Sequence, residues 1–74
     1  MALSKSQIIT LQILNQYEPQ KMNYQEIAKK SGARPMDISN ALRSLATRDL
    51  VYQLDMQGGT TITPDGREEL MNNM

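Results

Sequence analysis

The side chains best suited to specific recognition in this sequence lie in one stretch, residues 36–47. Four of them recur at the spacing of one helical face: Met36, Asn40, Arg43 and Thr47. Arginine can pair through two hydrogen bonds with guanine, and asparagine with adenine, on the major-groove edge of duplex DNA. Ser39 and Ser44 flank this row and suit phosphates or base edges. The stretch therefore has the chemistry of a helix that reads DNA.

The opposite side of the same helix fixes the direction in which this row points. Ile38, Leu42 and Leu45, flanked by Ala41, lie close together around the helix and must face a core. Any amphipathic helix turns polar residues outward, so the polarity alone is also typical of a solvated surface. The absence of glutamate from the outward positions favours DNA. Asp37 argues against it, unless it serves the N-terminus of the helix.

Charge is balanced over the whole chain but separated along it. Eight basic residues match eight acidic ones. Between Lys21 and Arg48 six basic residues face two acidic ones, whereas from Asp49 onward five acidic residues face one basic one. A basic segment can neutralise phosphates, although the split is also compatible with ordinary surface charge. The residues of this part of the chain predicted to contact DNA are Lys29, Lys30, Arg34, Pro35, Met36, Ser39, Asn40, Arg43, Ser44, Thr47 and Arg48.

Several functional classes lack the residues that they need. The sequence has no cysteine and no histidine, which removes disulfides, thiolate and imidazole catalysis, and the usual zinc sites. Asp65, Glu68 and Glu69 form a carboxylate cluster, but they fall in the first turn of a predicted helix, where negative charge is favourable in itself. We therefore expect no enzyme, no cofactor, no metal and no small-molecule substrate.

Length and hydropathy set the scale of the protein. We expect residues 1–74 to form a single domain, at the small end of what folds alone. No apolar run approaches the roughly 18 to 20 residues of a membrane span. Residues 1–7 lack the basic and apolar parts of a signal peptide. These features favour a cytoplasmic protein with no membrane partner.

Three helices are predicted in the first two thirds of the chain. The first begins at Ser4 or Ser6 and ends at residue 15 or 16. After a loop over residues 17–21, Asn23 and Glu26 form a capping box that starts a short second helix with Tyr24 turned inward. Gly32 ends it. The third helix runs from about Pro35 to Arg48, so the pair reads as a helix-turn-helix unit.

A hairpin and a fourth helix follow. Residues 50–55 and 60–63 alternate as strands, with a glycine-containing tip at residues 57–59. Thr63 then caps a helix whose first residue is Pro64 and whose end frays over residues 72–74. The predicted fold is α+β, mostly α: a three-helix winged helix-turn-helix with a small β-hairpin wing and a short C-terminal helix.

The first helix is apolar on two faces, so it needs two partners. Ile8, Leu11 and Leu14 form one stripe, and a second stripe lies about 100° away. The second can pack on the C-terminal helix or on another copy of the chain, and a monomer is nearly as well supported as a homodimer. The residues predicted for a dimer interface are Leu3, Ile9, Ile13, Tyr17, Leu70 and Met71.

From Ile8 to Leu70 the chain resembles the winged helix superfamily, most closely the compact MarR-like regulators. The residues that carry the resemblance are 24–28, Gly32, the apolar face of the third helix, 49–51 and the exit TITPDGR at residues 61–67. Asp49 stands where the pattern usually has glycine, and Arg34 where it usually has a serine or threonine cap. Aspartate tolerates the left-handed conformation better than most residues.

The resemblance implies a third helix in the major groove and a wing, residues 56–60, near the DNA backbone or minor groove. The wing tip contains no lysine or arginine, so Gln57 is its candidate contact. We expect a sequence-specific binder of double-stranded DNA and a small transcriptional regulator. The alternative is a winged helix that serves as a protein-protein adaptor, which the bare wing and the acidic C-terminal third favour and the glutamate-free helix face opposes.

Overall fold

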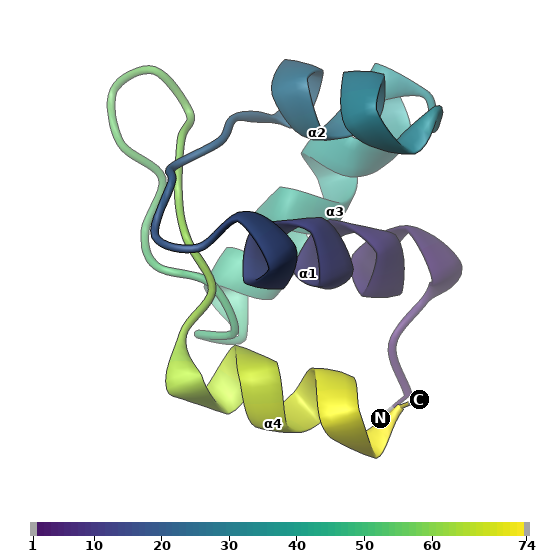
Figure 1. The fold of residues 1–74 in the computed structure, drawn as a ribbon, viewed down its shortest axis with the longest axis vertical. Helices are drawn as coiled ribbons and strands as arrows, with labels where there is room; N and C mark the ends of the chain where they lie inside the picture. Colours follow the sequence, from purple (N-terminus) through teal and green to yellow (C-terminus); the bar gives the residue numbers. More distant parts are fainter. Residues whose placement is uncertain (1, 74) are drawn as a thin grey trace.

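Residues 2–73 are described by a computed structural model, and four helices lie within them. They are α1 (Lys5–Tyr17), α2 (Tyr24–Ser31), α3 (Pro35–Thr47) and α4 (Pro64–Asn72). Their bounds agree with the predicted helices to within about two residues; residue 74 of the predicted frayed end lies outside the described part. In Figure 1, α1 crosses the middle of the molecule between α2 and α4, with α3 behind it, and α1 contacts all three.

Local capping explains where the first two helices begin. The Ser4 hydroxyl accepts a hydrogen bond from the Gln7 N–H at 3.2 Å, and the Gln7 side chain accepts one from the Ser4 N–H at 2.8 Å. Asn23 and Glu26 form the same reciprocal pair at the start of α2, at 3.0 and 3.1 Å, as predicted. These bonds satisfy backbone donors that the first turn of a helix leaves without partners.

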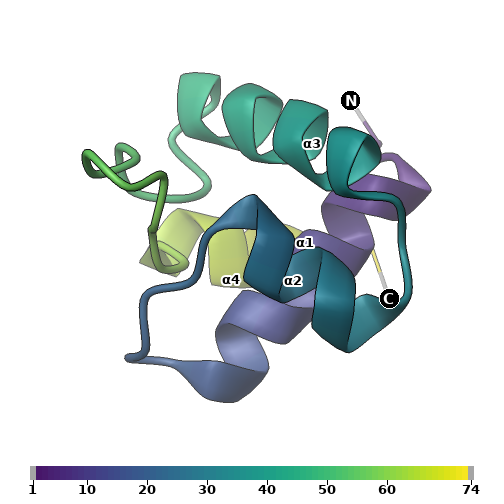
Figure 2. The same cartoon turned by 90° about the horizontal axis from the view of Figure 1, so that it is seen from above.

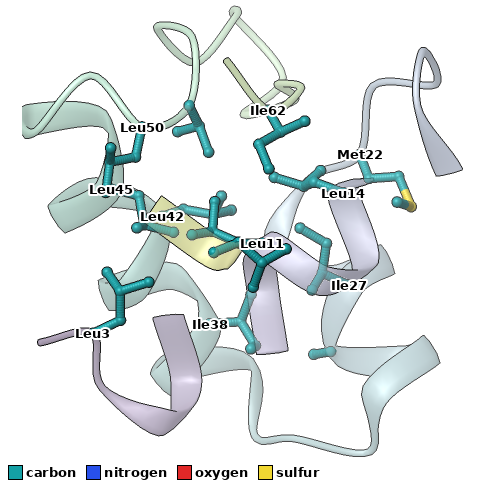
Figure 3. Packing of buried hydrophobic residues seen from close by; sticks show 13 residues of the cluster. Leu3, Leu11, Leu14, Met22, Ile27, Ile38, Leu42, Leu45, Leu50 and Ile62 are labelled. Carbon is teal, nitrogen blue, oxygen red and sulfur yellow. The ribbon is translucent and has the colours of Figure 1, made fainter. Parts of the chain in front are cut away.

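The core forms where all four helices meet. In Figure 3, Leu11 and Leu14 of α1 point among side chains from α3 and from the segments that follow it. Burying one such leucine or isoleucine stabilises the fold by about 1.5 to 3 kcal/mol. The buried hydrophobic residues are Leu3, Leu11, Leu14, Met22, Ile27, Ala28, Ile38, Ala41, Leu42, Leu45, Leu50, Val51, Ile62 and Leu70.

The predicted β-hairpin is not confirmed, because residues 50–55 and 60–63 do not form a regular ladder. Among the described residues the antiparallel pairing is limited to two isolated bridges, Val51 with Ile62 and Met22 with Thr60. One residue beyond the Val51–Ile62 bridge, the Thr60 hydroxyl donates a hydrogen bond to the Tyr52 carbonyl oxygen at 2.6 Å. This bond occupies an acceptor that a longer ladder would use. The Thr60 backbone pairs instead with Met22, at 3.2 Å in both directions. The wing is therefore an irregular loop anchored to the segment before α2.

An aspartate organises the tip of this loop. The Asp55 carboxylate accepts hydrogen bonds from the backbone N–H groups of Gln57 at 2.9 Å and Gly59 at 2.8 Å. Gly58 lies between them with a φ of +82°, a conformation that favours glycine. The hydrogen bond from Gly59, with smaller effects of Gln57 and Lys21, holds the pKa of Asp55 below its ordinary value against an opposing effect of partial burial. A negative charge therefore stabilises the wing tip.

The chain leaves α3 and enters α4 through one tightly bonded junction. Asp49 has a φ of +60°, so the aspartate does adopt the left-handed conformation expected of it. The Thr63 hydroxyl donates to the Asp49 carbonyl oxygen at 2.9 Å and accepts from the Gly66 N–H at 2.9 Å. Arg67, one residue further on, makes a two-point ion pair with Glu18 at 2.6 and 3.0 Å. These bonds fix α4 against α1 and the end of α3.

Candidate nucleic-acid interface

The outward face of α3 is built as the sequence predicts. Ile38, Leu42 and Leu45 are buried, and the four residues opposite them are exposed: Met36, Asn40, Arg43 and Thr47. Arg34 precedes this helix without a side-chain capping bond, and Pro35 occupies its first turn. Figure 2 shows α3 along one edge of the molecule, with the wing beside its C-terminal end. The arrangement leaves one long side of α3 open to a partner.

Two polar side chains on this face are free for recognition. Within residues 2–73, neither Asn40 nor Arg43 makes a side-chain hydrogen bond or ion pair. The Thr47 hydroxyl, by contrast, donates to the Arg43 carbonyl oxygen at 3.0 Å. Ser44 lies on the α1 side, where its hydroxyl accepts a hydrogen bond from the Gln7 amide at 2.9 Å. Asn40 and Arg43 are therefore the better candidates for base contacts.

A surface groove runs beside these two residues, between the start of α2 and α3. Its lining is Tyr24, Pro35, Met36, Ser39, Asn40 and Arg43. Tyr24 was predicted to turn inward, but the structure leaves it 36 % exposed. Tyr24 is the first residue of a helix of only two turns, so it lies at the edge of the core. This position in the sequence could have predicted that Tyr24 is partly exposed. The groove combines an apolar wall with polar and cationic groups.

The two other arginines predicted to contact DNA differ in how strongly other side chains of the protein hold them. Arg34 is 85 % exposed and pairs with Asp37 at 3.1 Å. Such an exposed ion pair contributes little to stability, so the Arg34 guanidinium can exchange Asp37 for a phosphate. Arg48 lies 3.6 Å from Glu69 of α4, in a pair that is about two-thirds buried on both sides. The ion pair of Arg48 with Glu69 therefore connects α4 to the C-terminal end of α3.

Lys29 and Lys30 lie on a different part of the surface. They line a hollow with Gln20 and Glu26, and none of these four residues belongs to α3. The Lys30 ammonium also lies 4.5 Å from the centre of the Tyr17 ring, within the range of a cation–π contact. These lysines add positive charge to α2 but do not line the groove beside α3.

The wing tip presents an unusual surface. Met56 is fully exposed and Gln57 is exposed. Lys21, which was not predicted as a contact, lies 4.0 Å from the Asp55 carboxylate because the Met22–Thr60 bridge brings its segment to the wing. The sequence suggested an extended piece at residues 21–23 but not its partner. Lys21 is thus a cation near the wing that sequence reasoning missed.

The residues predicted for a dimer interface separate into two groups. Leu3 and Leu70 are buried in the core of the chain itself. Ile9 and Ile13 are half-buried against that core, and Tyr17 is covered in part by Lys30. Met71 is 71 % exposed on α4. The apolar surface left for a second copy is therefore smaller than the sequence suggested.

Two negative findings apply to the described part of the chain. No group of three or more histidine, cysteine, aspartate or glutamate side chains there is arranged to hold a metal ion. Among its helices, none combines the length and the apolar character that crossing a membrane requires.

Comparison with known proteins supports the architecture. No family model matches the chain, and no curated protein sequence matches it. Over 96 % of its length it is similar to the crystal structure of MepR, a transcription regulator of the Staphylococcus aureus multidrug efflux pump MepA, with a TM-score of 0.77 and 24 % identity. It is also similar to RV1404 from Mycobacterium tuberculosis over 96 % of its length, with a TM-score of 0.76 and 19 % identity.

These similarities define the class of fold. The chain spans about half of each matched protein, 55 % of MepR and 52 % of RV1404. The fold that the chain shares with them is a winged helix, as the resemblance in the sequence predicts.

Proposed function

We propose that this chain binds double-stranded DNA in a sequence-specific manner through the exposed face of α3, and that it acts in transcriptional regulation. The observation that carries the proposal is the state of Asn40 and Arg43. Both are exposed and unbonded to other side chains of residues 2–73, and no carboxylate stands in their row. Their amide and guanidinium groups match the edges of adenine and guanine in the major groove.

The fold gives this chemistry a suitable frame. In helix-turn-helix proteins the second helix of the unit enters the major groove and its N-terminal residues meet the base edges. Here that helix is α3, and Met36 and Asn40 lie in its first two turns. MepR, with which the chain shares this fold, is a transcription regulator. That likeness supports the proposal, and the side chains of α3 indicate which contacts would read the sequence.

Phosphate contacts are assigned to groups around the reading face. Arg34 stands at the N-terminal end of α3, and Lys21 stands beside the wing. The basic side chain of each of their ion pairs is exposed, so a DNA phosphate can replace the carboxylate partner. Lys29, Lys30 and Arg48 contribute positive charge at longer range, and Gln57 is the contact offered by the wing tip. The expected binding is therefore strongly salt-dependent.

We further propose that two copies bind together. One such domain covers one half-site, and a symmetric pair reads an inverted repeat. The residues left for that contact are Ile9, Ile13, Tyr17 and Met71. Sedimentation equilibrium over a wide concentration range tests the dimer, and a strict monomer at high concentration, with and without DNA, would remove it.

The experiment that tests DNA binding uses a salt series and a selection. The purified chain is titrated into random-sequence duplex at several salt concentrations, and the bound fraction is amplified and sequenced. The proposal expects an affinity that falls steeply with salt and an enriched sequence; for a dimer, half-sites lie about one helical turn apart. Absence of binding at the lowest salt would overturn it.

A protein-protein adaptor is the second candidate, and the wing favours it. Met56 is fully exposed beside an acidic residue, Asp55, at the position where a DNA-binding wing needs positive charge. The exposed Met56 side chain is therefore available to an apolar group of a protein partner. Loss of DNA binding at every salt concentration, together with capture of a defined partner that Met56→Ala weakens, would establish the adaptor.

A further inference from the structure

The groove beside α3 has a chemical character that hydrogen bonding alone does not explain. Tyr24, Pro35 and Met36 give it an apolar wall, and Ser39, Asn40 and Arg43 give it a polar rim. Met36 is 74 % exposed, although it occupies the first turn of α3 and stands in the row of the proposed base-reading residues. An exposed thioether at that position suits an apolar partner atom.

The major groove of DNA offers one such group. Thymine presents a C5 methyl beside its O4 acceptor, whereas the other standard bases present hydrogen-bonding edges there. Methionine has an unbranched and adaptable side chain that fits irregular apolar surfaces. Because Met36, Asn40 and Arg43 follow one another along the same face, a thymine at Met36 would lie near the purines that Asn40 and Arg43 can read.

We propose that Met36, backed by Tyr24 and Pro35, forms a receptor for the C5 methyl group of a thymine in the DNA half-site. This inference rests on the proposed DNA binding and adds the identity of one base and of the group that is recognised. The cationic rim favours a nucleic acid over an apolar protein segment, because Arg43 has no carboxylate partner within residues 2–73 and would gain a counter-ion from a DNA phosphate or hydrogen-bond acceptors from a guanine edge.

Deoxyuridine provides the probe, because it differs from thymidine only by the missing methyl group. Selection is first carried out with a duplex pool that contains thymidine. In the best duplex, each thymidine of the half-site is then replaced singly by deoxyuridine, and dissociation constants are measured for the original chain. One replacement is expected to weaken binding by about three- to fivefold, as loss of a methyl-sized apolar contact would. The other replacements are expected to leave it nearly unchanged.

Two methionine variants connect this effect to the groove. Met36→Ala should bind the thymidine and deoxyuridine duplexes equally, at about the affinity that the original chain has for the deoxyuridine duplex. Met56→Ala is the matched control, since Met56 is another exposed methionine but lies at the wing tip; it should keep the discrimination. Both side chains are exposed, so neither replacement should affect folding, which circular dichroism and thermal denaturation check.

The outcomes separate this inference from the function on which it rests. DNA binding with no sensitivity to any deoxyuridine, or with a sensitivity that persists in Met36→Ala, would overturn the thymine receptor and leave DNA binding intact. Failure to bind any duplex would overturn both. Equal loss of discrimination in Met36→Ala and Met56→Ala would assign the effect to the overall apolar surface and would also overturn the receptor.

Discussion

The α carbon of Gly66, in the first turn of α4, lies directly against the backbone carbonyl group of Leu50. Leu50 is the residue immediately after Asp49, which has the left-handed conformation. The same carbonyl oxygen accepts a hydrogen bond from the Thr63 N–H at 3.2 Å. Sixteen positions apart in sequence, the two residues fix how closely α4 approaches the end of α3. This approach gives a physical reason for glycine in the TITPDGR exit.

Replacing Gly66 by alanine should destabilise the fold strongly. The added methyl group would overlap the Leu50 carbonyl oxygen and crowd the Ile62 side chain, and a backbone atom cannot move aside as a flexible side chain can. Overpacking of this kind costs about 2 to 3 kcal/mol in the free energy of unfolding. Urea denaturation of the variant measures the loss.

Gly32→Ala separates overlap from backbone strain. Gly32 has a φ of +76° but no neighbouring atom where the methyl group would stand. Its replacement should cost about 1 kcal/mol, from the left-handed conformation alone. Equal losses for the two variants would show that the contact with Leu50 is unimportant.

The four helices could be predicted because their signals are local. Ser4 with Gln7 and Asn23 with Glu26 act over three residues, and Gly32 and Thr63 act at single helix ends. The wing could not be predicted in the same way. Threonine is a residue type favoured in strands. The backbone of Thr60 nevertheless pairs with Met22, which lies far away in sequence.

The candidate site shows the same division. The angular positions of Asn40 and Arg43 on α3 follow from helical periodicity, and the structure confirms that they point outward. Helical periodicity does not reveal which side chains from other elements already occupy a polar group. Gln7 reaches Ser44, and Glu69 reaches Arg48, through contacts that only the tertiary fold creates.

Thr63→Val should lower stability through two hydrogen bonds of one hydroxyl. That hydroxyl caps α4 by accepting from the Gly66 N–H and binds the Asp49 carbonyl oxygen as a donor, both at 2.9 Å. Valine keeps the shape but removes both bonds in a buried place, so the expected loss is about 2 kcal/mol or more in the free energy of unfolding.

Thr63→Ser is the matched control, because serine keeps the hydroxyl and loses only a methyl group. It should cost about 1 kcal/mol or less. Thermal and urea denaturation of both variants provide the comparison. If serine were as damaging as valine, packing of the methyl group would be more important than the cap.

Stability should fall as the pH drops below the ordinary range of an aspartate. The pKa of Asp55 is lowered from 3.8 in the folded chain, chiefly by the hydrogen bond from the Gly59 N–H. A carboxyl group with a lowered folded pKa stabilises the protein above its unfolded pKa, and this contribution is lost as the pH falls through the folded value. Asp55→Asn should therefore be less stable than the original chain at pH 7, with the difference narrowing towards pH 2.

Lys21→Gln tests the cause of that shift. Lys21 is exposed and lies 4.0 Å from the Asp55 carboxylate, so its charge is a minor influence beside the backbone hydrogen bonds. Urea denaturation at several pH values should show nearly the same pH dependence for Lys21→Gln as for the original chain. If the variant behaved like Asp55→Asn, the ion pair would be the main cause.

Arg43 in α3 and Arg48 at its C-terminal end should respond differently to replacement. Arg43 makes no ion pair within residues 2–73, whereas Arg48 is bound to Glu69 at 3.6 Å. If Arg43 pairs with a guanine, Arg43→Ala should weaken binding to the selected duplex by about 1 to 3 kcal/mol and relax the sequence preference at one position. It should leave the free energy of unfolding nearly unchanged.

Arg48→Ala should show the reverse pattern, because it leaves Glu69 without its partner at the junction of α3 and α4. We expect a loss of about 0.5 to 1 kcal/mol in stability, since the pair is only partly buried, and no change in the preferred sequence. Binding titrations, a repeated selection and urea denaturation on both variants test this contrast. A relaxed preference in Arg48→Ala with an unchanged one in Arg43→Ala would move the base-reading role from the middle of α3 to its C-terminal end.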